Sequence, residues 1–327
     1  MKKMFLAFLL TMFIASFAIS SDKILIYISG PEKMVSMIES MFEKKHGDVI
    51  DVYHTGSGPL QQKVWTEMMA GSIQADIIWG AEPLMYYSLM DVGVLQAYYP
   101  QEYDELYDEL KVGDGHFTPT GIRYGTMIVN KTEVSADDFP NSWMDLKNEA
   151  FVNQIAMADA SQSAMAFALF AALSEMDNGK ELLESMGGNG VFVTRMNMDA
   201  ISVVQTGEKS VCIAPSDGAY RLMKSQKSKG MDPVLQLCWP EEGAILIQRP
   251  IALVKKQRSD QQQETAELFL DFSISETCQK LSSQFGFETV RKDLDFVLFK
   301  DVQKMTVDWE TLWMNKDEIL NLYAEWF

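Results

Sequence analysis

Short apolar runs and amphipathic segments alternate along the first third of the chain. Predominantly apolar runs at residues 23–28, 49–53 and 75–79 predict buried β-strands. Between the last two runs, Leu60 and Val64 keep the four-residue spacing of one helical face. Strands and helices that alternate at this spacing are typical of right-handed βαβ units, whose parallel sheet is covered on both faces.

The same alternation returns after residue 116. The acidic, tyrosine-rich segment 98–116 interrupts it and reads as a surface excursion. Beyond it we expect strands at residues 126–130, 155–158, 211–214 and 251–254, and helices at 143–147, 161–173, 261–272, 276–285 and 316–326. The pattern predicts an α/β protein of two lobes joined by more than one crossover, with a cleft where strand ends face each other.

The N-terminus has the pattern of an export signal. Two lysines precede an apolar run at residues 4–19, and small residues around Ala18 and Ser20 form a cleavage site. A transmembrane anchor is the alternative, but the run is shorter than the ~20 residues that a spanning helix needs. No cysteine lies near the cleavage point, so a lipid anchor is not indicated. We predict that residues 1–20 are a cleavable signal peptide and that the mature protein is periplasmic.

Charge and cysteine content narrow the function. The chain of 327 residues has a formal net charge of −18, which argues against nucleic acid as a partner. A small anion remains possible, because local N–H groups and one or two arginines are enough to bind it. Cys212, Cys238 and Cys278 are widely spaced and odd in number, so we expect buried thiols, with at most one pair such as Cys212 with Cys238. We expect no metal site and no cofactor.

The three strands of the first third all end in a glycine that is followed by a proline. The junctions are Ser29-Gly30-Pro31, Thr55-Gly56-Ser57-Gly58-Pro59 and Trp79-Gly80-Ala81-Glu82-Pro83. Glycine lets another group approach the backbone closely, and proline is favoured at the first position of a helix. Free N–H groups at helix N-termini attract anions. Three such ends on one parallel sheet would form a rim of hydrogen-bond donors.

Several segments together resemble the periplasmic solute-binding proteins of ABC importers. They are the opening residues 23–30, the Ser57-Gly58 turn, residues 75–80, 238–243, 249–252 and 268–272, and Phe285-Gly286-Phe287. The resemblance spans residues 23–291, and it is strongest to the branch of ferric-ion, thiamine, phosphonate and sugar-phosphate binders. It implies a hinged two-lobed fold that closes on its ligand and docks on a membrane permease.

The resemblance also suggests how the chain is divided. We expect residues 21–122 plus 246–327 to form lobe 1 and residues 123–245 to form lobe 2. We expect the mature protein to be a monomeric receptor rather than an enzyme.

A phosphate or phosphonate group is the ligand that the available residues favour. Hydroxyl and N–H donors would come from lobe 1 and from the start of a lobe 2 helix, the candidates being Ser29, Gly30, Thr55, Ser57, Gly58, Ser161 and Ser163. Arg123, at the crossing between lobes, could hold two oxygens. Asp217, with Glu82 or Glu242, could bind ligand hydroxyls or an amine, and Trp79 offers an aromatic face. A sugar phosphate ranks ahead of an aminoalkylphosphonate.

Ferric iron is the alternative ligand. Relatives that bind iron use paired tyrosines on a lobe 2 loop, and phenolates and carboxylates suit a hard cation. Here the loop at residues 215–220 holds one tyrosine, Tyr220, and no His or Tyr stands near Ser29. The pair Tyr86-Tyr87 lies on the first-lobe helix, where one ring is expected in the core.

Each candidate also has a plain structural interpretation. Serines at helix starts are often N-caps, Asp217 suits a turn, Arg123 could form a salt bridge, and Trp79 could be core. A secreted hydrolase is a remote alternative: Ser57 and His54 are close in sequence, but no orienting acid is evident.

Overall fold

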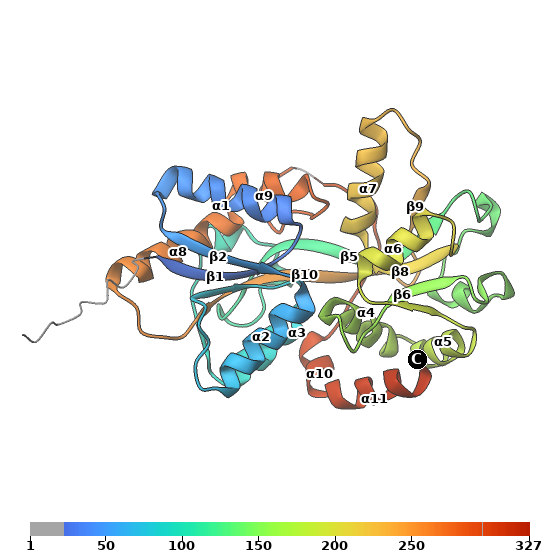
Figure 1. Cartoon of the computed structure of the whole chain (residues 1–327), viewed down its shortest axis with the longest axis horizontal. Coiled ribbons are helices and arrows are strands. Elements are labelled where there is room, and N and C mark those ends of the chain that lie inside the picture. Colours follow the sequence, from blue (N-terminus) through green and yellow to red (C-terminus); the bar gives the residue numbers. More distant parts are fainter. Residues whose placement is uncertain (1–22, 296) are drawn as a thin grey trace, which may run out of the picture.

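Two long antiparallel strands join the two halves of the molecule (Figure 1). In this computed structural model, which describes residues 23–295 and 297–327, they are β5 (Thr118–Asn130) and β10 (Ala244–Val254). They pair from Thr118 with Ile251 to Gly125 with Ile245. The described strands form one sheet of order β2-β1-β3-β10-β5-β8-β6-β7. The predicted signal peptide lies outside the described residues.

The first lobe is built on three parallel strands, β1 (Ile24–Ser29), β2 (Ile50–Thr55) and β3 (Ile77–Trp79). Alternate side chains of β1 point to opposite faces of the sheet, and helices cover both faces. Ile26 packs under the helices α1 (Glu32–His46), α8 (Asp260–Ile274) and α9 (Glu276–Ser283). Tyr27 packs with the opposite layer, which holds α2 (Ser57–Met69) and α3 (Leu84–Asp91). Figure 1 shows these helix layers above and below the sheet.

The second lobe repeats this architecture. Its parallel strands are β6 (Ile155–Ala158), β7 (Phe192–Thr194) and β8 (Val211–Pro215), and β9 (Leu235–Cys238) pairs with β5. Its helices are α4 (Ala164–Ser174), α5 (Gly179–Gly188), α6 (Asn197–Gln205) and α7 (Ser216–Ser228). The expected two-lobed α/β fold is therefore confirmed.

The remaining short elements connect or cover the lobes. They are β4 (Leu95–Gln96), β11 (Lys304–Met305), α10 (Trp309–Met314), α11 (Lys316–Trp326) and the 3₁₀ turns Tyr103–Glu105, Asp108–Leu110, Ala136–Asp138, Trp143–Lys147 and Glu149–Phe151. The segment 143–147, predicted as helical, is thus a 3₁₀ turn. Within the described part of the chain, no helix has the length and apolar character needed to cross a bilayer.

The crossing strands are longer than predicted. The pattern gave strands at 126–130 and 251–254, whereas β5 begins at Thr118 and β10 at Ala244. Glycines and a proline break the apolar pattern in their shared region, and a bulge between Gln248 and Pro250 accommodates the missing N–H of proline.

The cysteines are buried free thiols, as expected. Cys212 of β8 and Cys238 of β9 pair with neighbouring residues on opposite sides of β5. Strand β5 therefore lies between Cys212 and Cys238, the two cysteines that the sequence left as a possible disulfide pair.

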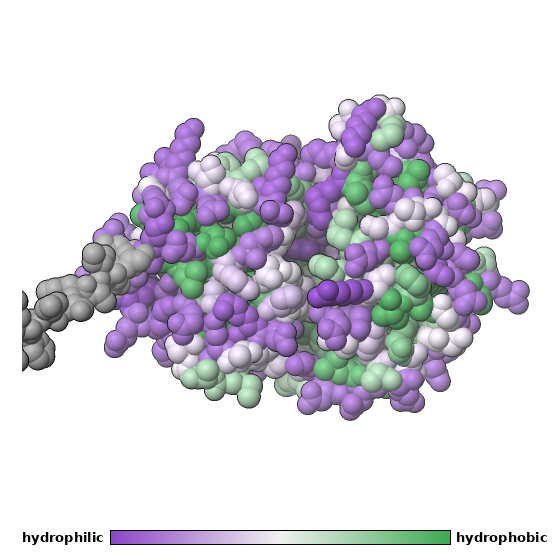
Figure 2. Space-filling view, in the orientation of Figure 1, coloured by the Kyte–Doolittle hydropathy of each residue, from purple (hydrophilic) through white to green (hydrophobic). Residues whose placement is uncertain are grey.

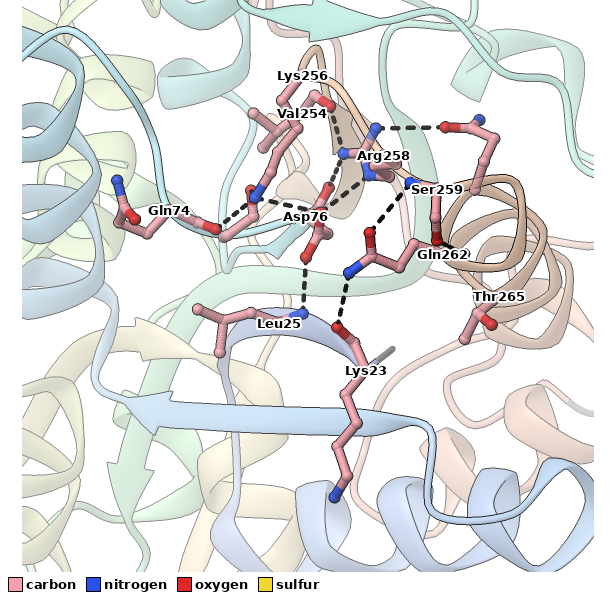
Figure 3. Close-up of polar contacts among 12 residues, drawn as sticks. Lys23, Leu25, Gln74, Asp76, Val254, Lys256, Arg258, Ser259, Gln262 and Thr265 are labelled. Carbon is pink, nitrogen blue, oxygen red and sulfur yellow. Dashed lines mark hydrogen bonds and ion pairs between the residues drawn. The ribbon is translucent and has the colours of Figure 1, made fainter. Parts of the chain in front are cut away.

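A buried ion cluster fixes the outer end of the first lobe (Figure 3). The Asp76 carboxylate accepts hydrogen bonds from the Leu25 N–H at 2.8 Å and the Arg258 Nε at 2.9 Å, and Lys256 Nζ lies 3.2 Å away. Arg258 also donates to the carbonyls of Asp76 and Val254. Here a buried arginine has a carboxylate partner, which is the usual arrangement for a buried charge.

Candidate functional site

A cavity of about 780 Å³ lies between the two lobes. Helices from both lobes begin at its wall, among them α2 at Ser57, α3 at Leu84, α4 next to Ser163 and α6 at Asn197. Their N-terminal N–H groups give this wall a positive potential. Figure 2 shows the surface hollowed between the two halves of the molecule. Of the three lobe 1 junctions that the sequence suggested as a rim, the starts of α2 and α3 reach this wall and residues 29–31 do not line it; α4 and α6 add helix starts from lobe 2.

The two lobes touch at the rim of this cavity. A Cβ atom at Gly58 would lie only 2.2 Å from the carbonyl oxygen of Gln162, and one at Gly56 would lie 3.8 Å from the Met196 side chain. Glycine is therefore required at residue 58 by the opposite lobe in this closed arrangement.

Arg123 of β5 and Asp217 of α7 form a buried pair, and neither residue lines the 780 Å³ cavity. Arg123 Nη1 lies 3.4 Å from Asp217 Oδ1, and both side chains are buried. Asp217 also pairs with Arg221 at 2.5 Å, so one carboxylate serves two guanidinium groups. The Nε of Arg123 has no hydrogen-bond partner among the described residues. Burial lowers the pKa of Arg123, and Asp217 opposes this effect.

Arg249 lies beside this pair and was not selected from the sequence. It is 1% exposed, and its guanidinium stacks on Trp79 at 4.4 Å from the ring centroid. Its Nη2 donates to the Ser29 carbonyl at 2.7 Å, and no carboxylate of the described chain lies within ion-pair distance. Burial, together with the charge of Arg123, lowers its pKa to about 9. Phe287 lies under both guanidinium groups, at 4.6 Å from Arg123 and 5.6 Å from Arg249.

Ser29 and Gly30 adjoin Arg249 at the end of β1. The Ser29 hydroxyl is buried and has no hydrogen-bond partner among the described residues. A Cβ atom at Gly30 would lie 3.1 Å from Arg249 Nη2, so glycine leaves room for the guanidinium. Thr55 ends the neighbouring strand β2, next to His54, whose Nε2 lies 2.8 Å from the Gly30 carbonyl oxygen.

The polar groups of the cavity wall differ in how far they are already paired. Glu82 is buried, accepts from the Leu84 N–H at 2.6 Å, and has its pKa raised to about 7 by burial. Ser163 caps α4 by accepting from the Ala166 N–H at 3.2 Å. Ser161 is exposed and donates to Asp159. The cap interpretation thus applies to Ser163.

Three predicted residues lie apart from this group. Trp79 is fully buried and donates to Thr120 at 2.7 Å, so its face supports Arg249. Tyr220 packs edge-on against Phe299. Glu242 accepts from Ser142 and from the Trp143 N–H, which places it at a turn away from the 780 Å³ cavity.

The pair Tyr86-Tyr87, of which one ring was expected in the core, is buried at both positions. The Tyr86 hydroxyl contacts the backbone of Gly80, Ile78 and Pro250, and burial raises its pKa. Burial also raises the pKa of Tyr87, to about 12. Among the described residues, no cluster of three or more His, Cys, Asp or Glu side chains could hold a metal ion.

Comparisons with known proteins agree with this architecture. The family model described as bacterial extracellular solute-binding protein matches residues 74–315. The periplasmic protein AfuA from Actinobacillus pleuropneumoniae, solved with fructose-6-phosphate, and iron-bound HitA from Pseudomonas aeruginosa are each 19% identical to this chain. Each has a TM-score of 0.78 over 93% of this chain and 98% of theirs.

A ferric binding protein from Campylobacter jejuni is 18% identical, with a TM-score of 0.79 over 93% of this chain and 99% of its own. A comparison with curated protein sequences gives no match. At these identities the solved structures establish the fold, and the family model covers most of the chain. The chain therefore belongs to the bacterial extracellular solute-binding proteins, the substrate-binding components of ABC importers.

Proposed function

We propose that this protein captures a small phosphorylated or phosphonylated metabolite, a sugar phosphate in the first instance, between its two lobes. The observation that carries the proposal is the excess of buried positive charge on β5 and β10, the strands that join the two lobes. Arg249 has no carboxylate partner among the described residues, and Arg123 shares Asp217 with Arg221. A buried charge is costly unless it is paired, and a ligand oxyanion between the lobes would supply the missing partner.

Unpaired hydrogen-bond donors on the same residues and on Ser29 support this choice. The buried Ser29 hydroxyl and the Nε atoms of Arg123 and Arg249 have no hydrogen-bond partner within the described chain. A phosphate monoester has three terminal oxygens and needs several such donors. The N-terminal N–H groups of α2, α4 and α6 add further donors along the cavity wall.

The other predicted residues have subordinate roles in this proposal. Glu82 would bind a ligand hydroxyl or amine. Further hydrogen-bonding groups that line or adjoin the cleft are Ser57, Thr55, Ser161 and Ser163. Asp217 orients Arg123, and Tyr220 stays outside the first contacts.

Iron is the less favoured ligand. The structural relatives include AfuA solved with fructose-6-phosphate and iron-bound HitA, and they share only the fold with this chain at 19% identity. A ferric site needs several anionic oxygens, whereas buried arginines would repel the cation. Burial of Tyr86 and Tyr87 also opposes the phenolate form.

We further propose export through a signal peptide at residues 1–20, a monomeric mature form, and delivery of the ligand to a membrane permease after the lobes close. We keep the lobe division 21–122 plus 246–327 and 123–245, although α11 packs on α4 and α5 of the second lobe.

Thermal unfolding in the presence of matched ligands tests the proposed function. Fructose 6-phosphate should raise the Tm of the protein, and fructose at the same concentration should not, because only the phosphate reaches the arginines. Equal shifts from both compounds would refute an oxyanion site. A visible charge-transfer band with ferric citrate, lost in Tyr220→Phe, would instead establish an iron site.

A further inference from the structure

The C-terminal tail, residues 304–327, connects the two lobes a third time. Its strand β11 pairs with β10 at Ala244 and Ile245. Its helix α10 packs on α3 of the first lobe, and α11 packs on α4 and α5 of the second. Figure 1 shows α10 near the middle of the molecule beside α3 and α11 beneath the second lobe. The tail therefore bridges the two lobes.

Aromatic contacts hold the tail in this position on both sides. The Trp313 ring stacks on Trp65 of α2, with centroids 6.0 Å apart and planes 12° from parallel. On the other side, Phe170 of α4 meets Tyr323 and Phe327 edge-on, at 5.2 and 5.8 Å. Such pairs are worth more than their buried area alone. The tail is thus seated on each lobe by packed rings.

Residues of the tail also line the 780 Å³ cavity. Trp313, Lys316 and Leu320 form part of its wall, opposite Ser57 and Ser163. Lys316 is the first residue of α11 and lies with its ammonium 5.0 Å from the Trp313 ring centroid. No ion-pair partner of Lys316 lies within 4 Å among the described residues. Its positive charge acts on Glu82, the buried carboxyl of the same cavity.

We propose that the tail is a third wall of the ligand cleft and that Lys316 supplies a cation to the ligand space. This role of Lys316 rests on the proposed function in one respect, namely that the ligand is anionic. A short link at Asn315 joins the two helices. Lys316 therefore stands where α10, which packs on α3 of the first lobe, passes to α11, which packs on α4 and α5 of the second. Its ammonium would lie beside an anion bound between the closed lobes.

Two lysine variants and one matched control test this role. Lys316→Gln removes the charge, and Lys316→Arg keeps it. The control Lys180→Gln removes a lysine that pairs with Glu318 of the same tail but does not line the cavity. In titration calorimetry with fructose 6-phosphate, Lys316→Gln should weaken binding about tenfold, the loss of one charge-assisted contact. Lys316→Arg and Lys180→Gln should stay within about twofold of the unaltered protein.

A second readout needs no ligand. The carboxyl band of Glu82 in the infrared spectrum, identified by its loss in Glu82→Gln, reports the pKa of that group. Removing the Lys316 charge should raise this pKa further, and Lys180→Gln should leave it unchanged.

Each combination of results decides one claim. Unchanged affinity and an unchanged Glu82 pKa in Lys316→Gln would overturn the third wall. A shifted Glu82 pKa in a protein that binds no phosphorylated probe would uphold the wall and refute the proposed ligand class. If Lys180→Gln weakened ligand binding as strongly as Lys316→Gln, the specific role of Lys316 would also be overturned.

Discussion

Replacing Arg249 by methionine separates a ligand-binding arginine from a structural one. Arg249→Met keeps much of the volume of the side chain and removes its charge. If a buried charged side chain has a structural role, removing it destabilises the folded protein. The loss in the free energy of unfolding is about 3–5 kcal/mol when the removal leaves a charged partner unpaired. Arg249 has no carboxylate partner in the described chain, so we expect a different outcome.

The magnitude follows from the contacts of the guanidinium. Its pKa is lowered from 12.5 to about 9, a difference that corresponds to a burial cost of about 5 kcal/mol. Methionine avoids that cost but loses the hydrogen bond to Ser29 at 2.7 Å and the stacking on Trp79 at 4.4 Å, about 2 kcal/mol each. The opposing contributions nearly cancel. The free energy of unfolding of the ligand-free variant should therefore change by about 1 kcal/mol at most.

Binding should respond far more strongly than stability. A bidentate contact between guanidinium and phosphate is worth about 3 kcal/mol, so Arg249→Met should weaken the binding of fructose 6-phosphate by about 100-fold or more. Denaturant unfolding of the ligand-free protein and titration calorimetry measure the two quantities separately.

Arg258→Met is the matched control, because this second buried arginine has a carboxylate partner (Figure 3). Its loss removes the hydrogen bonds to Asp76 and Val254 and should destabilise the protein by about 3–5 kcal/mol without changing affinity. If Arg249→Met were the destabilised variant and still bound the ligand with unchanged affinity, the reasoning would be refuted.

Three further variants test the cleft. Gly58→Ala should weaken ligand binding at least about fivefold, because its Cβ would meet the Gln162 carbonyl oxygen when the lobes close; unchanged calorimetric affinity would mean that the closed form does not bind the ligand. Glu82→Gln should change the pH profile of stability. Because burial raises the folded-state pKa of Glu82 to about 7, its contribution to stability is full below about pH 4.5 and is lost as the pH rises through 7. The variant should lack this decline of about 3 kcal/mol between pH 4.5 and 8 in denaturant unfolding, and a decline equal to that of the parent would contradict the assignment. Ser29→Ala should weaken fructose 6-phosphate binding about tenfold and leave ligand-free stability within about 1 kcal/mol, whereas Ser282→Ala, a buried serine of α9, should leave affinity unchanged.

The sequence predicted those parts of the fold that local pattern determines. The apolar runs placed β1, β2 and β6 within a residue or two, and the spacing of residues 316–326 gave α11 its observed bounds. Glycine and proline marked the starts of α1, α2 and α3, and the starts of α2 and α3 line the cavity. The central stretch of β5 and β10 was missed, because Gly121, Arg123 and Pro250 break an apolar pattern that only the pairing of the two strands restores.

The charge arrangement of the site could not be predicted in the same way. Arg249 belongs to a motif that suggested the family. Only the fold shows that it lies beside Arg123, 126 positions earlier, and that no carboxylate of the described chain pairs with it. Trp79 was expected as a ligand face, and instead its ring supports that arginine. Glu242 was grouped with the site from its sequence motif, whereas its partners are Ser142 and Trp143. An unpaired buried charge is a property of three-dimensional neighbours, so no local pattern reveals it.

Native mass spectrometry of the protein purified from its own host tests the central claim most directly. We expect a bound small molecule that is released on lobe opening and whose fragmentation yields a phosphate or phosphonate anion. The same molecule should be absent from Arg249→Met prepared in parallel. A bound ferric ion, or a ligand without any anionic group, would contradict the oxyanion site.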